Sequence, residues 1–254
     1  MRRAQRRGLA HEAADRIRES IFEGQVPPGA ALREVELASS LDVSRGSVRE
    51  GLAILEREGL VHSEWHRGAR VIELSPDDVD EVYTVRAALE RLATRTAATR
   101  ATPERLAELS GVVGAMERAL AAGAEGPALL SLDMAFHDRV YDTAGNSRLT
   151  KAWHGVRSQV FLFQLTRIRL GHAQYRSAVV DEHRDLVRML AGGDTPALGD
   201  AAAEHVDSAR RALAHMLGGP LPATGAVRTT PRASTAPATP SEGPDRATGR
   251  PTAH

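Results

Sequence analysis

The chain has 254 residues, of which 42% are hydrophobic and 26% are charged, as in an ordinary globular protein. Its 33 basic and 33 acidic residues balance, so no overall positive charge favours binding to nucleic acid. The sequence contains no cysteine, which excludes disulfides, thiolate metal sites and cysteine nucleophiles.

The ends and the apolar runs of the chain bear on its location. The basic N-terminus "MRRAQRRGLAHEAADRIRES" is not followed by an apolar segment, so a secretory signal is not expected. No stretch approaches the roughly 18 consecutive apolar residues that a membrane-spanning helix needs. We therefore expect a cytoplasmic protein that does not interact with a membrane.

Composition divides the chain into three regions. Residues 1–74 contain short helical patterns followed by extended runs, and residues 75–217 contain long helical patterns rich in Ala, Leu and Arg. Residues 218–254 are rich in Pro, Thr, Ala and Gly and have too few large apolar groups to offset the entropy of ordering. The sequence thus predicts a mainly α protein with two ordered domains and a disordered tail.

The first region reads as three short helices and a hairpin. "HEAADRIRESIFEG" and "EVELASSLDV" have helical periodicity and are separated by the Pro/Gly turn "VPPGAALRE". A third helix follows in "SRGSVREGLAILEREGLV", with Ser44 as its N-cap. Two extended runs around "HRG" in "LVHSEWHRGARVIEL" predict a β-hairpin. This order is that of a winged helix-turn-helix.

The second region reads as a helical bundle. Ser75 with Pro76, and Thr102 with Pro103, are N-cap pairs that begin two long helices. Further helices are expected at about 127–143, 147–169, 173–191 and 195–217, separated by short loops. About six helices with short connections predict an antiparallel all-α bundle.

Arginines near the start of the third helix are the candidate DNA contacts. Residues 1–75 contain 12 Arg and 12 Asp and Glu, so DNA binding depends on where the arginines point. Arg45, Ser47 and Arg49 lie opposite the apolar stripe of this helix, and an arginine fork pairs with guanine or with phosphate. Arg67 and Gly68 stand at the hairpin tip. The alternative is a solvated helix face with i,i+4 ion pairs.

These motifs resemble a known family. "GQVPPGAAL", "E-x-x-LA-x-x-L-x-VSR-x-x-VRE-x-L-x-x-LE-x-EGLV" and "RGARV" are similar to the GntR family of bacterial transcription regulators, over about residues 8–74. The resemblance implies DNA contacts at Arg45, Ser47, Arg49, Arg67 and Gly68. Two positions depart from the pattern. Gly51 replaces the usual Ala, a small loss of helix propensity, and Val35 replaces an Arg that some members use, so no contact is assigned there.

Three histidines and one aspartate in the second region stand on apolar faces. Asp133 and His137 are four residues apart, and such a pair can be a salt bridge, half of a metal site or an acid/base pair. His183 and His205 lie on the apolar stripes of two later helices. Together these side chains would suit a divalent ion such as Zn²⁺, Ni²⁺ or Mn²⁺. The alternative is a set of separate core histidines, because periodicity cannot show that they converge.

The second region is similar to the FCD-type ligand-binding domain of the FadR-like GntR subfamily. The motifs are "EVYTVRAALERLATRTAA", "D-x-x-FH-x-x-V-x-x-x-AGN-x-x-L" and "EH-x-x-L-x-x-x-L-x-x-GD-x-x-A" followed by "EH", over about residues 76–216. The resemblance implies a six-helix bundle, a homodimer and a ligand, often a small carboxylate, beside or on a metal. It assigns the metal ligands, which are Asp133, His137, His183 and His205.

Two further residues are candidates for ligand binding. Arg86 shares an apolar stripe, so its guanidinium is expected to point inward, either as a clamp for a ligand carboxylate or as an ion-pair partner of Glu90. Asn146 in "AGN" is a helix cap, the preferred interpretation, or a donor in the ligand pocket.

The sequence therefore predicts a homodimeric transcription regulator, a repressor rather than an activator, that responds to a small ligand. The dimer would bind a pseudo-palindromic operator in double-stranded DNA. A metal-dependent hydrolase is one alternative, disfavoured because four protein ligands crowd the ion and no nearby general base is evident. A regulator that senses the metal itself is another.

Overall fold

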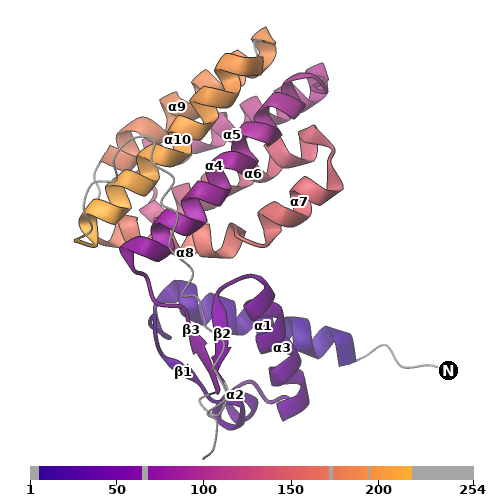
Figure 1. Ribbon diagram of the computed structural model, residues 1–254, viewed down its shortest axis with the longest axis vertical. Helices are drawn as coiled ribbons and strands as arrows, with labels where there is room; N and C mark the ends of the chain where they lie inside the picture. Colours follow the sequence, from indigo (N-terminus) through magenta and orange to yellow (C-terminus); the bar gives the residue numbers. More distant parts are fainter. Residues whose placement is uncertain (1–5, 65–67, 172–173, 194, 219–254) are drawn as a thin grey trace, which may run out of the picture. The chain divides into compact units, whose positions relative to one another are not determined.

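The computed structural model describes residues 6–64, 68–171, 174–193 and 195–218. Its N-terminal domain contains three helices and three short strands (Figure 1). In chain order these are α1 (Arg6–Glu23), β1 (Ala31–Leu32), α2 (Glu34–Ser40), α3 (Arg45–Arg57), β2 (Val61–Glu64) and β3 (Gly68–Val71). The predicted order of three helices followed by a hairpin is confirmed.

The three strands form one antiparallel sheet in the order β1-β3-β2. In the predicted hairpin Val61 stands opposite Val71, and Glu64 stands opposite Gly68. Strand β1 was not predicted, since it is only two residues long and follows a Pro/Gly turn. It pairs with the outer side of β3, so the wing has a central strand and two edge strands.

The core of this domain lies between α1, α3 and the sheet. Ile17 of α1, Val48 and Leu55 of α3 and Val71 of β3 are all fully or nearly fully buried. Ser44 caps α3 by accepting a hydrogen bond from the Ser47 amide, as predicted. The apolar stripe of α3 therefore faces the core, and its other face is left for solvent or DNA.

The C-terminal domain is an all-helical bundle. Its helices are α4 (Pro76–Ala98), α5 (Pro103–Ala121), α6 (Gly126–Ala144), α7 (Ser147–His154), α8 (Arg157–Arg169), α9 (Gln174–Gly192) and α10 (Thr195–Met216). Helices α4, α5, α6, α9 and α10 pack against one another side by side (Figure 1). The predicted caps at Ser75 and Thr102 are present, and Ser75 forms a full capping box with Asp78.

The helix predicted over 147–169 is instead two helices. Helix α7 ends at His154 with Gly155 as its C-cap, and α8 begins after Val156. A lone glycine within an apolar pattern is tolerated in many helices, so the pattern gave no clear sign of the break. The described part of the bundle therefore has seven helices, where about six were expected.

Two predictions concern residues beyond these ranges. Apart from Gly218, the tail expected over 218–254 lies outside the described residues, as does Arg67 at the wing tip. In the described part of the chain, no helix is both long enough and apolar enough to cross a membrane.

Candidate functional site

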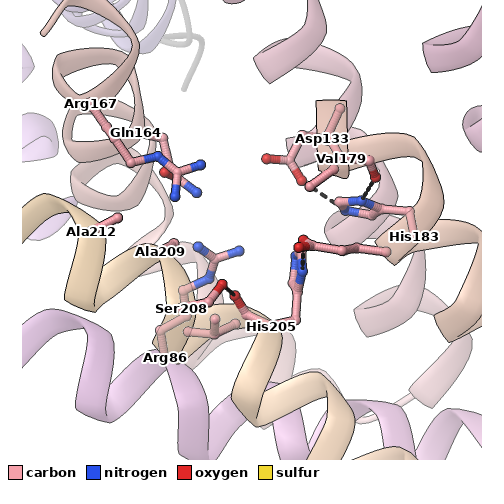
Figure 2. A pocket seen from close by; sticks show the side chains of 13 residues that line it. Arg86, Asp133, Gln164, Arg167, Val179, His183, His205, Ser208, Ala209 and Ala212 are labelled. Carbon is pink, nitrogen blue, oxygen red and sulfur yellow. Dashed lines mark hydrogen bonds and ion pairs between the residues drawn. The ribbon is translucent and has the colours of Figure 1, made fainter. Parts of the chain in front are cut away.

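Four side chains from three helices converge inside the C-terminal bundle. Asp133 and His137 come from α6, His183 from α9 and His205 from α10. Each offers one ligand atom, and all four of these atoms lie within 4.8 Å of one another. Figure 2 shows Asp133, His183 and His205 facing a common space. The convergence that the sequence could not establish is therefore present in the fold.

The Asp133 carboxylate stands at the middle of this cluster. Its Oδ1 lies 2.9 Å from Nε2 of His183 and 3.4 Å from Nε2 of His137. All three side chains are almost completely buried. Both Nε2 atoms lack a hydrogen bond of acceptable geometry in the described structure, although they are close to a carboxylate. Two imidazole nitrogens thus point at one small buried volume beside an anionic oxygen.

Each histidine is held from behind by a second group. Nδ1 of His137 lies 2.7 Å from Oε1 of Glu90, and Nδ1 of His205 lies 2.8 Å from Oε2 of Glu182. His183 donates from Nδ1 to the Val179 carbonyl oxygen at 2.6 Å. Because every Nδ1 is engaged, the Nε2 atoms are left for the centre. Metal-binding histidines are commonly fixed by such outer partners.

Charge in the cluster is balanced by these contacts. Burial would raise the pKa of the Asp133 carboxyl, but His137 and His183 outweigh burial and hold that pKa well below its usual range. Burial likewise disfavours the charged form of His137, yet the Glu90 carboxylate outweighs it and raises the pKa of His137 to about 9. Burial lowers the pKa of His205 despite its bond to Glu182. At neutral pH, His137 is therefore an imidazolium between Glu90 and Asp133.

The cluster opens into a cavity of about 400 Å³. Helices α4, α6, α8, α9 and α10 supply its walls. Its polar and charged lining residues are Arg86, Asp133, Gln164, Arg167, Glu182, His183, His205 and Ser208. This volume lies within the range of small-molecule sites.

Arg86 lies in the wall of this cavity and is 1% exposed. Its Nε and one terminal nitrogen, Nη1, make no hydrogen bond within the described structure. The alternative of an ion pair with Glu90 is not what the contacts show, because the two oxygens of Glu90 accept from His137 and from the Tyr141 hydroxyl. A buried guanidinium with free donors facing a cavity suits an anionic ligand.

Asn146 does not take part in this site. Its Oδ1 accepts from the amides of Arg148 and Leu149 and so caps α7, as the preferred interpretation predicted. The residue is exposed and is absent from the cavity wall. The ligand-binding role assigned to Asn146 is therefore corrected to a structural one.

The predicted DNA contacts on α3 differ in exposure. The side chains of Arg45 and Arg49 are 64% and 68% exposed. Ser47 is instead buried, and its hydroxyl lies 3.0 Å from the hydroxyl of Ser44 within the helix cap. The two arginines are accessible to DNA, whereas Ser47 is engaged in the structure of the helix start.

A carboxylate on α2 holds the second of these arginines. Glu34 accepts from Nε and Nη2 of Arg49 at 2.8 and 2.7 Å, and lies 3.9 Å from Arg45. The ion pairing considered from the sequence was within one helix, at i,i+4, whereas this pair joins two helices. At the wing, Gly68 has a φ of +77°, which explains glycine at that turn.

Comparison with known proteins identifies both domains. Residues 9–71 match the family described as "Bacterial regulatory proteins, gntR family", and residues 81–208 match the FCD domain. Together the two matches span almost all of the described chain.

The names of similar proteins agree with these matches. The chain is 31% identical over 219 residues to the "Probable D-xylose utilization operon transcriptional repressor" of Paenarthrobacter nicotinovorans, covering 86% of this chain and 94% of that protein. It is 30% identical over 223 residues to the Uxu operon transcriptional regulator of Escherichia coli strain K12, covering 80% of this chain and 85% of that protein. In fold it is similar to E. coli McbR/YncC, with a TM-score of 0.69 at 21% sequence identity. The match covers 82% of this chain and 97% of that one.

These families and relatives are transcription regulators and not enzymes, which sets aside the hydrolase alternative. With a GntR module followed by an FCD domain, the chain belongs to the GntR family of bacterial transcription regulators.

Proposed function

We propose that this regulator binds operator DNA through α3 and the wing, and that a small carboxylate held at a divalent metal ion changes its affinity for that operator. One observation carries the proposal. The ligand atoms of Asp133, His137, His183 and His205 lie within 4.8 Å of one another in a buried cluster. The partners behind the three histidines are what a metal site requires, and separate core histidines would not need to converge.

The donor set fits a divalent transition metal. Three imidazoles, all neutral once His137 has released its proton, and one carboxylate suit Zn²⁺, Ni²⁺ or Mn²⁺. When bound, the ion would supply positive charge and coordination positions for an acidic ligand. Arg86 contributes from the chain itself, because its buried guanidinium has donors at Nε and Nη1 that make no hydrogen bond within the described structure.

For DNA, we assign base or phosphate contacts to Arg45 and Arg49 at the start of α3. Arg67 and Gly68 of the wing complete the set, and Ser47 would contact DNA only if its hydroxyl turned away from Ser44. As a homodimer the protein would read a pseudo-palindromic operator with two copies of α3. The names of relatives such as the P. nicotinovorans repressor support repression as its mode of action.

The ligand must bind one conformation of the regulator better than another in order to change operator affinity. The test begins with an operator selected from a random duplex library. Binding of the full chain to it is then measured with and without Mn²⁺, Ni²⁺ or Zn²⁺, and with a panel of small carboxylates. His183→Ala should lose bound metal and the carboxylate response but keep basal DNA binding.

Two results would overturn parts of this proposal. If the purified protein takes up no divalent ion under any condition, the four side chains are structural. If removing the ion abolishes DNA binding and no carboxylate has any effect, the ion itself is the signal. Mutant proteins are compared by circular dichroism first, so that a folding defect is recognised.

A further inference from the structure

Helix α2 carries an apolar side chain that the core of its domain does not use. Val35 is 60% exposed, the most exposed of the large hydrophobic residues in the described part of the chain. The other apolar residues nearby, Leu37, Ala38 and Leu41, pack against the core instead. Valine also has a lower helix propensity than most residues. Packing and local structure therefore give no reason for valine at this position.

Val35 lies beside the arginines of α3 that we assign to DNA. Glu34, the residue before it, accepts from Nε and Nη2 of Arg49 at 2.8 and 2.7 Å and lies 3.9 Å from Arg45. Because consecutive Cα atoms are only about 3.8 Å apart, Val35 is one short step from the point where α2 meets these arginines. A single exposed valine needs no explanation by itself, but this one adjoins the side chains expected to enter the major groove.

The charges around Val35 suit the approach of DNA. The carboxylate that follows it, Glu36, is paired with Arg33 at 2.8 Å, and the carboxylate that precedes it is paired with Arg49. The side chains of Arg33, Arg45 and Arg49 are 72%, 64% and 68% exposed. Three exposed arginines thus stand against two carboxylates, and this balance attracts a polyanion to the surface that holds Val35.

An aliphatic side chain recognises one feature of the major groove. Thymine presents a methyl group there, at C5, and apolar side chains distinguish thymine by contact with that methyl group. Arginine forks pair with guanine or phosphate, whereas valine has no polar group with which to bind either. The two γ-methyl groups of Val35 therefore give the surface a contact of a second kind.

We infer that Val35 contacts the methyl group of a thymine in the operator and is a specificity-determining residue for DNA. Since bases follow one another at about 3.4 Å along a strand, this thymine lies within about three base pairs of the site of the Arg49 contact. The inference rests on the proposed function, because it requires α3 to enter the major groove.

The test is a thymine scan of the operator selected from the random duplex library. Each thymine is replaced in turn by deoxyuridine, which removes only the methyl group, and binding of the full chain is measured by fluorescence anisotropy. One replacement should weaken binding about three- to fivefold, the factor that corresponds to one buried methyl group. The dependence on salt should not change, since no phosphate contact is lost.

Val35→Ala removes both γ-methyl groups at an exposed position. In this variant the sensitive thymine and deoxyuridine should be bound equally well, because the two changes remove the same contact and their effects do not add. Val35→Thr keeps the branched shape and one methyl group, and should still prefer thymine. Val85→Ala is the matched control, since Val85 of α4 is 50% exposed, and it should keep the full preference.

Two results would overturn the inference and leave the proposed function standing. In the first, no thymine near the Arg49 contact is sensitive to replacement by deoxyuridine. In the second, a sensitive thymine remains equally sensitive in Val35→Ala, so that another residue or the shape of the DNA is responsible. If the full chain selects no operator from the library, the proposed function itself is overturned.

Discussion

Glu90 of α4 lies 2.7 Å from His137 of α6, oxygen to Nδ1, and both side chains are buried. This pair fixes the ring of His137 and directs its Nε2 toward Asp133. Glu90 is not one of the four residues of the candidate metal site, so its effect on that site is exerted through His137.

Replacing Glu90 by Gln removes the charge and keeps the shape of the side chain. We expect metal affinity to fall about 10- to 100-fold, the usual cost of losing an outer partner of a metal-bound histidine. The measurement is a competition titration of the purified protein with Zn²⁺ or Ni²⁺ against a chromophoric chelator. Glu108→Gln, at an exposed site on α5, is the control. Unchanged affinity in Glu90→Gln would show that the pair is incidental to the site.

The stability of the metal-free protein should depend on pH through His137. The pKa of His137 is raised from 6.5 to about 9 in the folded state. A raised pKa stabilises the fold fully below pH 6.5, and the contribution is lost as pH rises through 9. Its size is about 3 kcal/mol from the free energy of one pKa unit. Urea unfolding at pH 6, 7.5 and 9.5 measures it, with His137→Gln as reference.

Between about pH 6 and 9.5 the free energy of unfolding should fall by about 3 kcal/mol more in the unchanged protein than in His137→Gln, and an equal fall in both would contradict the expectation. The same raised pKa predicts that metal uptake near pH 7 releases a proton, since a ligating imidazole must be neutral. Metal affinity should therefore increase with pH between about 7 and 9.

Glu34 should limit non-specific binding to DNA. Its carboxylate holds Arg49 and repels phosphate, so DNA must compete with it for the arginine. Glu34→Gln is expected to increase affinity for random duplex severalfold and to narrow the ratio of operator to random binding. Arg49→Ala should instead weaken operator binding and lower its salt dependence by about one phosphate contact, with metal content unchanged.

Fluorescence anisotropy with operator and random duplexes over a range of salt concentrations measures both effects. Arg57→Ala, at the other end of α3, is the matched control and should change neither. If Glu34→Gln weakens binding to operator and to random duplex alike, Glu34 orients Arg49 for DNA. It then does not compete with DNA for this arginine.

Gly51 is expected to resist replacement by Ala. A Cβ at this position would lie 3.0 Å from the Ala10 carbonyl oxygen and 3.1 Å from the Ala14 amide nitrogen, so α1 would have to move. We expect Gly51→Ala to destabilise the N-terminal domain by about 1–3 kcal/mol, the usual cost of overpacking. Gly111→Ala on α5, where a Cβ meets nothing within 4 Å, should stabilise by about 0.5–1 kcal/mol. Thermal unfolding measures the change in stability of both variants. An increase in stability in Gly51→Ala would show that α1 moves aside for the added methyl group at little cost.

That comparison also shows what helix propensity leaves out. From the sequence, Gly51 is a small loss of propensity at a position where the family usually has Ala. The structure adds the reason for glycine, which is the close approach of the α1 backbone. Helix propensity is a property of a single helix, whereas the close contact at Gly51 is made between α3 and α1. The sequence gives no direct sign that these two helices approach each other at Gly51.

The cluster of Asp133, His137, His183 and His205 could be predicted in part, because its members stand on apolar faces at helical spacing. The burial of Glu90 could have been predicted in the same way, because it belongs to the buried stripe of α4. That stripe consists of Val79, Tyr83, Arg86, Glu90, Ala93 and Ala97. The alternative pairing of Glu90 with Arg86 at i,i+4 is not the hydrogen-bonded contact in the structure, because the oxygens of Glu90 accept from His137 and Tyr141 of α6. Long-range partners of this kind require the packing of helices and cannot be read from spacing.

Arg167 and Gln164 illustrate the limit further. Helix α8 has apolar residues on several sides and a weak periodicity, so its buried face is not evident from the sequence. The break at Gly155, which sets the direction of α8, was also missed. The place of Gln164 and Arg167 in the cavity wall therefore became visible only in the structure.

Helix α4 also joins the two domains along the chain. Four residues separate the end of the wing strand β3 at Val71 from the start of α4 at Pro76, and the Ile72 amide donates a hydrogen bond to the Leu60 carbonyl oxygen. At about 1.5 Å per residue, Arg86 lies about 15 Å along α4 from Pro76. A short backbone link leaves little slack, so a shift of α4 along its own axis would pull on the end of β3.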